Sequence, residues 1–209
     1  MTRPAVVFDF GGVVFRWQPL ALLQQVLPQH ATDDSGARAL AERIFQGFRP
    51  GSDWAGFDRG SLDADALAAR IAVRTGLATA EVRAVIDAIP PHLEPEPGTV
   101  ALLRALRDAR RPLYYLSNMP APYADHLERR HGFLAWFEAG LFSARIGLMK
   151  PEPAIFRRAE LDFGIDPARS LFIDDHAGNI EAARAAGWRA LHFTGPADCE
   201  AALREQGWL

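Results

Sequence analysis

The sequence is poor in cysteine, lysine and net charge. Cys199 is the single cysteine of 209 residues, which excludes an internal disulfide framework and a cluster of thiolate metal ligands within one chain. Of the 23 basic residues only Lys150 is a lysine, so this residue stands out among arginines. The formal net charge of -3 leaves no basic surplus for holding a nucleic-acid backbone or an anionic membrane surface. We therefore expect neither nucleic acid nor membranes as partners.

Long apolar runs are missing as well. No stretch approaches the roughly 20 apolar residues that span a bilayer. The run Ala5–Phe8 is too short, and is followed too soon by Asp9, to be the core of a signal peptide. Hydrophobic residues still make up 49% of the chain, which is enough to bury a core. These features predict a soluble, cytoplasmic globular protein, and they leave monomer and homodimer equally open.

Three short apolar runs each end in a polar residue. They are Ala5–Phe8, Pro112–Leu116 and Leu171–Ile173, followed by Asp9, Ser117 and Asp174 respectively. Helical patterns such as Val100–Leu106 and Ile180–Ala186 alternate with them. This alternation predicts an α/β fold with a Rossmann-like parallel sheet. Ligands of such sheets bind beyond the carboxyl ends of the strands, so we expect these polar residues to meet there.

Residues 17–90 differ from the rest of the chain, because their pattern is almost wholly helical and shows no alternation with strands. Ser35, Ser61 and Thr79 precede apolar-periodic stretches and are predicted as N-caps. The proline-dense stretch Pro90–Gly98 cannot continue a helix and returns the chain to the sheet. We predict a helical cap domain, residues 17–90, inserted into an α/β core domain formed by residues 1–16 and 91–209.

The polar residues at the strand ends suit phosphoryl transfer. Asp9 carries an anionic oxygen that can attack phosphorus in line and form an aspartyl-phosphate. Asp174 and Asp175, brought near Asp9, would repel it unless a divalent cation lay among them, and oxygen ligands of this type suit Mg²⁺. Ser117 and Lys150 can stabilise the charge that develops on the phosphoryl oxygens.

In these residues the sequence resembles the haloacid dehalogenase superfamily. Its four motifs are Val7-Phe8-Asp9-Phe10-Gly11-Gly12-Val13, Leu116-Ser117-Asn118, Lys150-Pro151, and Phe172-Ile173-Asp174-Asp175 with Asn179. The helical insert resembles the C1 cap of that superfamily. Within it, Phe57-Asp58-Arg59-Gly60 resembles a segment of small bacterial sugar-phosphate phosphatases. The phosphatase domain of soluble epoxide hydrolases is similar in pattern too.

The resemblance and the chemistry together assign expected roles. The catalytic residues are Asp9, Ser117 and Lys150. The resemblance adds the backbone carbonyl of Gly11 to Asp9, Asp174 and Asp175 as Mg²⁺ ligands, and whether Asp174 binds the ion directly or through water stays open. Supporting residues around the phosphate and the metal loop are Gly12, Asn118 and Asn179. Expected substrate contacts from the cap are Trp54, Phe57 and Arg59.

One position departs from the commonest phosphatase pattern. That pattern has a second aspartate two residues after the nucleophile, which protonates the leaving group and then activates water, whereas this chain has Gly11 there. General acid–base help is worth about 10²–10⁴ in rate. A good leaving group departs with little protonation, so the enzyme could then do without the second aspartate. The anomeric oxygen of a sugar 1-phosphate is a better leaving group than an ordinary alcohol, which predicts faster hydrolysis of glucose 1-phosphate than of glucose 6-phosphate. Alternatively, a cap residue or His176 supplies the proton.

Two other functions are compatible with parts of the pattern. A 2-haloacid dehalogenase would use Asp9 without metal, and halide needs no protonation, but Asp174 and Asp175 would then repel the nucleophile uncompensated. A non-catalytic phosphometabolite-binding domain would not need Asp9. We therefore predict an Mg²⁺-dependent phosphomonoester hydrolase that acts on a small phosphorylated metabolite, with a sugar phosphate as the expected substrate.

Overall fold

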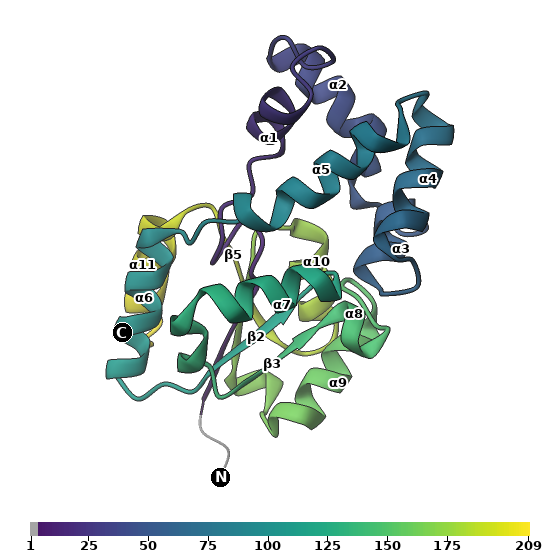
Figure 1. Ribbon diagram of the computed structural model, residues 1–209. Helices are drawn as coiled ribbons and strands as arrows, with labels where there is room; N and C mark the ends of the chain where they lie inside the picture. Colours follow the sequence, from purple (N-terminus) through teal and green to yellow (C-terminus); the bar gives the residue numbers. More distant parts are fainter. Residues whose placement is uncertain (1–3) are drawn as a thin grey trace.

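The computed structural model describes residues 4–209, so the first three residues of the predicted core segment lie outside the described part. A parallel sheet is covered by helices on both faces, and a further group of helices lies beyond one end of the strands (Figure 1). This arrangement confirms the predicted α/β fold. Within residues 4–209, no helix is both long and apolar enough to cross a bilayer.

The sheet has five strands in the order β3-β2-β1-β4-β5, and every pairing is parallel. Their bounds are β1 Val6–Phe8, β2 Leu113–Ser117, β3 Ala139–Phe142, β4 Leu171–Asp174 and β5 Arg189–His192. Alternate residues of β1 face opposite sides, because Val6 and Phe8 belong to one buried apolar cluster and Val7 to another. The central strand is therefore buried on both faces, as expected for a parallel sheet.

The helices fall into two sequence groups. The first group lies between β1 and β2 and comprises α1 Pro19–Val26, α2 Asp34–Phe45, the short 3-10 turn η1 Gln46–Phe48, α3 Asp53–Asp58, α4 Ala64–Thr75, α5 Thr79–His92 and α6 Pro97–Asp108. The second group comprises α7 Ala121–Arg130, η2 Gly132–Trp136, α8 Ser143–Ile146, α9 Pro153–Phe163, η3 Pro167–Arg169, α10 Ala177–Ala185 and α11 Pro196–Glu205. Helices α1 to α5 make up the layer beyond the strand ends, whereas α6 packs beside the sheet (Figure 1).

Two chain segments connect this helical layer to the sheet, and they run side by side. Phe15 pairs with Pro95 in an antiparallel bridge. The backbone N–H of Arg16 donates to Glu94 at 2.8 Å, and the Arg16 guanidinium donates to Glu96 at 2.8 Å. These two segments are the covalent links between the helical layer and the sheet, and hydrogen bonds hold them to each other.

The predicted N-caps are wrong by one or two positions. Helix α2 is capped by Asp33 rather than Ser35, and α4 by Asp63 rather than Ser61. Thr79 is the first residue of α5 and lies just inside it. At α2 and α4 an aspartate carboxylate accepts the orphan backbone N–H, so it takes the role expected of the serine hydroxyl.

Helix α5 continues through Pro90 and Pro91 to His92, although the prolines were expected to end it. A proline inside a helix leaves the carbonyl four residues earlier without its donor. For Pro90 that carbonyl belongs to Ile86, and the hydroxyl of Tyr123 donates to it at 2.8 Å. Helix α7 therefore supplies the hydrogen bond that Pro90 removes.

Candidate active site

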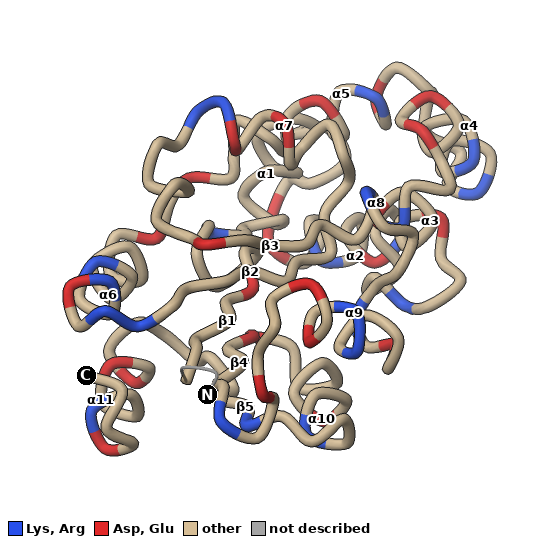
Figure 2. The backbone as a smooth tube through the Cα atoms, turned by 90° about the horizontal axis from the view of Figure 1, so that it is seen from below, with Lys and Arg blue, Asp and Glu red and all other residues tan. Residues whose placement is uncertain are grey.

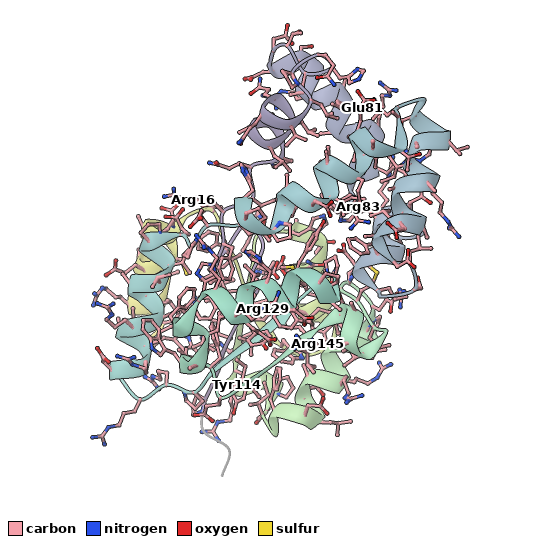
Figure 3. All side chains as sticks on the ribbon, viewed as in Figure 1. Arg16, Glu81, Arg83, Tyr114, Arg129 and Arg145 are labelled. Atoms are coloured by element: carbon pink, nitrogen blue, oxygen red, sulfur yellow. The ribbon has the colours of Figure 1, made fainter. Side chains whose placement is uncertain are left out.

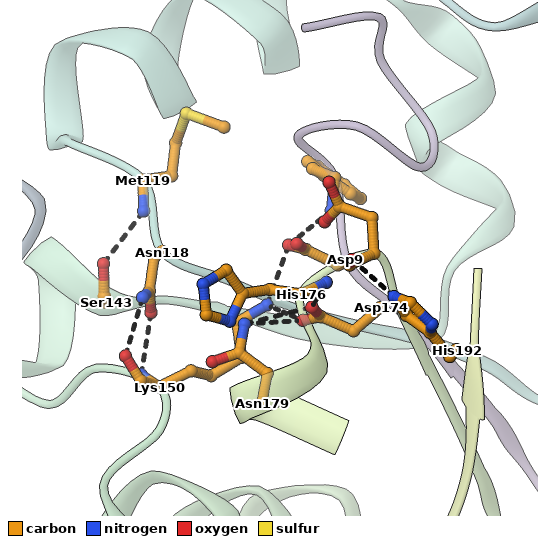
Figure 4. Close-up of polar contacts among 11 residues, drawn as sticks. Asp9, Asn118, Met119, Ser143, Lys150, Asp174, His176, Asn179 and His192 are labelled. Carbon is orange, nitrogen blue, oxygen red and sulfur yellow. Dashed lines mark hydrogen bonds and ion pairs between the residues drawn. The ribbon is translucent and has the colours of Figure 1, made fainter. Parts of the chain in front are cut away.

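The parallel register brings the predicted site residues to one edge of the sheet. Asp9 directly follows β1, while Ser117 ends β2 and Asp174 ends β4. Because β2 and β4 are the two neighbours of β1, their carboxyl ends flank Asp9. Figure 4 shows Asp9, Lys150 and Asp174 meeting through their polar atoms.

Lys150 is the cation of this cluster. Its Nζ lies 2.9 Å from Asp9 Oδ1 and 2.6 Å from Asp174 Oδ2. The side chain is 1% exposed, so the charge depends on these two carboxylates for stabilisation. Burial opposes the charged form, but Asp174 and Asp9 outweigh it and raise the pKa of Lys150.

Asn118 fixes the backbone of Lys150 rather than its ammonium group. The Asn118 Nδ2 donates to the Lys150 carbonyl at 2.9 Å, and the Lys150 N–H donates to Asn118 Oδ1 at 2.8 Å. Two hydrogen bonds therefore join the end of β2 to the segment that carries the lysine.

Asp174 is held by several donors. Asn179 Nδ2 donates to both carboxylate oxygens at 3.0 Å, and the backbone N–H of His176 donates to Oδ1 at 2.8 Å. With Lys150 also bound, both oxygens of Asp174 are engaged within the protein. Asn179 thus orders the acidic loop through two hydrogen bonds.

Three carboxylates form a candidate metal centre. Ligand atoms of Asp9, Asp174 and Asp175 all lie within 4.8 Å of one another. Burial raises the pKa of Asp9 to about 7, with Lys150 opposing and the two other carboxylates adding to the rise. Gly12 makes the approach of Asp175 possible: its φ is +75°, and a Cβ there would lie 2.3 Å from Asp175 Oδ2.

A buried hydroxyl at the end of β2 has no protein partner. Ser117 is 1% exposed, and its Oγ makes no hydrogen bond to any described residue. Buried hydroxyls are normally paired, so this one is available to a ligand. The observation fits the predicted role of Ser117 as a donor to a phosphoryl oxygen.

A cavity of about 310 Å³ opens over these residues, between the sheet and the helical layer. Its polar lining includes Asp9, Arg49, Asp58, Asn118, Lys150, Asp175, His176 and Asn179. Its apolar lining consists of Trp17, Phe48, Pro50, Trp54, Ile89, Leu93, Met119, Pro120, Tyr123 and Pro151. Gly11 also lines the cavity and contributes no side chain. The site therefore joins a charged floor to a largely apolar wall.

The three cap residues predicted to contact substrate do not share one environment. Trp54 lines the cavity. Phe57 is buried and packs edge-on against Trp54 and Tyr123, so it supports the wall without being part of it. Arg59 turns away to an ion pair with Glu152 and lines a separate hollow, together with Ser52, Asp53 and Arg70.

Sequence reasoning did not single out Asp58, which the structure brings into the cavity between those two residues. The side chain ends α3 and is buried, with 6% exposure. Its backbone carbonyl accepts a hydrogen bond from the Ser143 hydroxyl. The signal available in the sequence was the segment Phe57-Asp58-Arg59-Gly60, of which Asp58 is the one acidic residue.

Known proteins resemble this chain in sequence and in fold. The family model described as haloacid dehalogenase-like hydrolase matches residues 4–187. The chain is 28% identical to the sesquiterpene phosphatase astK of Aspergillus oryzae, over 92% of this chain and 91% of that protein.

Solved structures share the architecture at lower identity. A HAD family enzyme of Bacteroides thetaiotaomicron, in complex with magnesium and inorganic phosphate, aligns with a TM-score of 0.69 at 20% identity, over 91% of this chain and 93% of that one. The L-2-haloacid dehalogenase RSc1362 aligns with a TM-score of 0.70 at 23% identity, over 93% and 87% respectively. At these levels of sequence identity, the two structures show a shared fold and nothing further about function.

Proposed function

The chain belongs to the haloacid dehalogenase-like hydrolases, and from this premise we propose that it is an Mg²⁺-dependent phosphatase that hydrolyses a phosphate monoester through an aspartyl-phosphate on Asp9. The observation that carries the proposal is the cluster of three carboxylates around one buried lysine at the floor of a cavity. Similarity to a sesquiterpene phosphatase over nearly the whole chain supports the same reaction.

The donor set fits a magnesium ion. Three carboxylates face one ammonium group, so the cluster lacks positive charge, and carboxylate oxygens are the ligands that Mg²⁺ prefers. Asp9 and Asp175 would hold the ion, with the Gly11 carbonyl as the further ligand that the resemblance implies. Asp174 is engaged by Lys150 and Asn179, which favours an indirect role for it. When bound, the ion supplies charge neutralisation between Asp9 and an anionic substrate.

The chain's own residues perform the remaining steps. Asp9 attacks phosphorus, and the Asp9–phosphorus bond forms as the bond to the leaving oxygen breaks. Lys150 stabilises the charge on the phosphoryl oxygens, and the unpartnered Ser117 hydroxyl donates to one of them. Water then attacks the aspartyl-phosphate and releases inorganic phosphate. Residues 17–90 act as a cap that keeps bulk water away from this intermediate.

The substrate's organic part must suit the apolar wall. Most residues lining the cavity above the carboxylates are aromatic, aliphatic or proline, and the hydroxyl of Tyr123 is already committed to Ile86. Such a wall offers few partners to the hydroxyls of a sugar and favours the phosphate ester of a hydrophobic alcohol. The Aspergillus oryzae relative is a sesquiterpene phosphatase, and its name points to the same substrate class. A sugar phosphate, expected from the sequence, remains the competing prediction.

Phosphate release from a substrate panel tests both parts of the proposal. The panel is para-nitrophenyl phosphate, geranyl phosphate, glucose 1-phosphate and glucose 6-phosphate, each with Mg²⁺ and with excess EDTA. We expect Mg²⁺-dependent release that is lost in Asp9→Asn, with geranyl phosphate having the highest kcat/KM of the three biological esters. Higher rates on glucose 1-phosphate would instead support the sugar-phosphate prediction.

A 2-haloacid dehalogenase is the second candidate, because that activity would use the same Asp9 and the same fold. The acidic pair Asp174–Asp175 argues against it, since a metal-free reaction leaves their repulsion of Asp9 uncompensated. Chloride release from 2-chloropropionate, without phosphate release from any ester, would establish this alternative. Binding of phosphate esters without turnover would instead indicate the non-catalytic domain.

A further inference from the structure

Hydrolysis of an unactivated phosphate ester needs a proton donor near the leaving oxygen. The departing alkoxide is a strong base, and the water that attacks the intermediate must later lose a proton. The backbone position of Gly11 lines the cavity but carries no side chain for either task. The donor must come from another titratable group in contact with the same cavity.

Few titratable side chains that line the cavity are free for this task. Lys150 is held between Asp9 and Asp174, and Asp175 belongs to the candidate metal centre. Tyr123 donates its hydroxyl hydrogen to Ile86. Arg49 and His176, the other titratable lining residues, are exposed, and Arg49 pairs with Glu42. Asp58 is therefore the buried titratable side chain of the lining that no described contact holds, and the exposed His176 is the competing donor.

The position of Asp58 is built by several contacts around its backbone. The Ser143 hydroxyl donates to its carbonyl, while the same hydroxyl oxygen accepts the backbone N–H of Met119 at 2.9 Å. Two residues later, Gly60 has a φ of +80° and lies so close to α8 that a Cβ would stand 2.6 Å from the Ala144 carbonyl oxygen. The end of α3 is thus docked against the core beside Met119, in the segment that follows β2.

The Asp58 carboxyl itself has no described partner. Within residues 4–209, no hydrogen bond or ion pair reaches its side-chain oxygens; the residue is 6% exposed, and it lines the cavity. A largely buried carboxyl that no protein group holds is available to a ligand in the cavity. Asp9 and Lys150 are the charged groups that act on it. Burial, reinforced by Asp9 and opposed by Lys150, raises the pKa of Asp58 to about 7.

We propose that Asp58, on the cap side of the cavity, is the general acid and base of the reaction, in the role that Gly11 cannot fill. This inference rests on the proposed phosphatase function. In the first step Asp58 gives its proton to the leaving oxygen as the bond from Asp9 to phosphorus forms. In the second step Asp58, now a carboxylate, takes a proton from the water that attacks phosphorus and releases Asp9.

The variant Asp58→Asn tests the proposal, because it keeps the shape of the side chain and removes the transferable proton. On geranyl phosphate we expect kcat to fall by about 10²–10⁴. On para-nitrophenyl phosphate the leaving group departs without help, so the first step stays fast and the second becomes slow. The expected signature is a burst of para-nitrophenol equal to the enzyme concentration, followed by slow turnover, with the phosphoryl group retained on Asp9.

Three further variants make the result specific. Asp58→Glu keeps a carboxyl and should recover part of the geranyl phosphate activity, which a purely structural role would not predict. Asp65→Asn makes the same change at an exposed cap position, 88% exposed in its side chain, and should leave both rates unchanged. His176→Asn removes the competing donor at the mouth and should not produce a burst.

The possible outcomes distinguish a failure of the proposed role of Asp58 from a failure of the proposed phosphatase function. Wild-type rates for Asp58→Asn on both esters, or equal losses on both without a burst, would overturn the role of Asp58 and leave the phosphatase function intact. A burst in His176→Asn and none in Asp58→Asn would move the role to the histidine. Absence of phosphate release by the wild-type protein from any ester would overturn the proposed function itself.

Discussion

Lys150 was conspicuous in the sequence as the single lysine among arginines, and its environment explains why a lysine stands there. A compact ammonium group fits between Asp9 and Asp174 at 2.9 and 2.6 Å, in a position with 1% exposure. The planar guanidinium of an arginine is larger and donates along a fixed fork. The sequence therefore indicated that Lys150 is a special position. Its two partners could be identified only from the structure, in which the register of β1 against β4 brings Asp9 and Asp174 together.

Removing this charge should destabilise the protein as well as inactivate it. Lys150→Gln leaves Asp9 and Asp174 buried beside Asp175 without a cation. Breaking a buried pair in this way costs about 3–5 kcal/mol. We expect a loss of this size in urea unfolding in EDTA, and a smaller loss in Mg²⁺. Equal unfolding free energies for variant and wild type would contradict the account of the cluster.

Asp58 should make the stability depend on pH. Its pKa is raised from 3.8 to about 7 in the folded protein, so folding favours the protonated form. The stability that it contributes is complete below pH 3.8 and is lost progressively as pH rises from there through 7, a change on the order of 4 kcal/mol. Asp58→Asn should therefore match wild type near pH 4, gain on it progressively between pH 4 and 7, and exceed its Tm by several degrees at pH 8.5. A Tm difference that does not vary with pH would refute this.

At the scale of elements, three strands were predicted because each is a short apolar run that ends in a polar residue. Strand β3 was missed, because Ala139 and Gly140 weaken its pattern. Gly140 is required by a tertiary contact, since a Cβ there would lie 2.2 Å from the ring atoms of Tyr115 on β2. Local sequence does not report such a contact. For the same reason, the hydrogen bond from Tyr123 that satisfies Ile86 beside Pro90 could not be foreseen.

Ser143, at the start of α8, links three elements and should be sensitive to substitution. Its hydroxyl donates to Asp58 at the end of α3 and accepts from Met119 after β2. Ser143→Ala leaves both groups unpaired and should cost about 1–3 kcal/mol in unfolding free energy, with a lower kcat. Thermal denaturation and steady-state kinetics measure the two effects.

Ser170 provides a matched control for this substitution. It is also a fully buried serine, but its Oγ has no hydrogen-bond partner among the described residues. Ser170→Ala removes no hydrogen bond and should leave stability and kcat near their wild-type values. Equal effects of the two substitutions would show that the Ser143 contacts do not position the site.

At the scale of the whole molecule, charge is dispersed over the outside and concentrated in the site. Figure 2 shows acidic and basic positions interspersed along the outer helices α4, α6, α9 and α11. Figure 3 labels exposed arginines of this kind, including Arg83 and Arg145, which form ion pairs with neighbouring carboxylates. The labelled Arg16 lies at the connectors, where it pairs with Glu96 at 2.8 Å. Such exposed pairs contribute little stability, so the buried cluster dominates the electrostatics.

The floor of the site was predictable and its wall was not. Asp9, Ser117 and Asp174 follow or end strands, and parallel strands bring such ends together whatever the details of packing. The wall depends on how α3 and α5 turn in space. That is why Arg59 was expected in the cavity while its neighbour Asp58 occupies it. A cytoplasmic location stays a prediction, and monomer and homodimer stay the two alternatives for the oligomeric state.

Magnesium should stabilise the folded chain, because it binds a cluster that folding assembles. At a concentration of 100 times its Kd the gain is about 2.7 kcal/mol, which corresponds to a rise in Tm of about 5–10 °C for a chain of this size. Asp175→Asn removes one expected ligand and should reduce the rise, while its own Tm in EDTA should not fall. The same rise in variant and wild type would place the ion elsewhere.

The most direct test of the central claim is to look for the phosphoryl group on Asp9. Wild-type protein and Asp58→Asn are mixed with para-nitrophenyl phosphate and Mg²⁺, quenched in acid, and digested for peptide mass spectrometry. The account predicts phosphate on the peptide that contains Asp9, with more of it in Asp58→Asn, and none in Asp9→Asn or in EDTA. Para-nitrophenol release without any phosphorylated Asp9 peptide in either protein would contradict it.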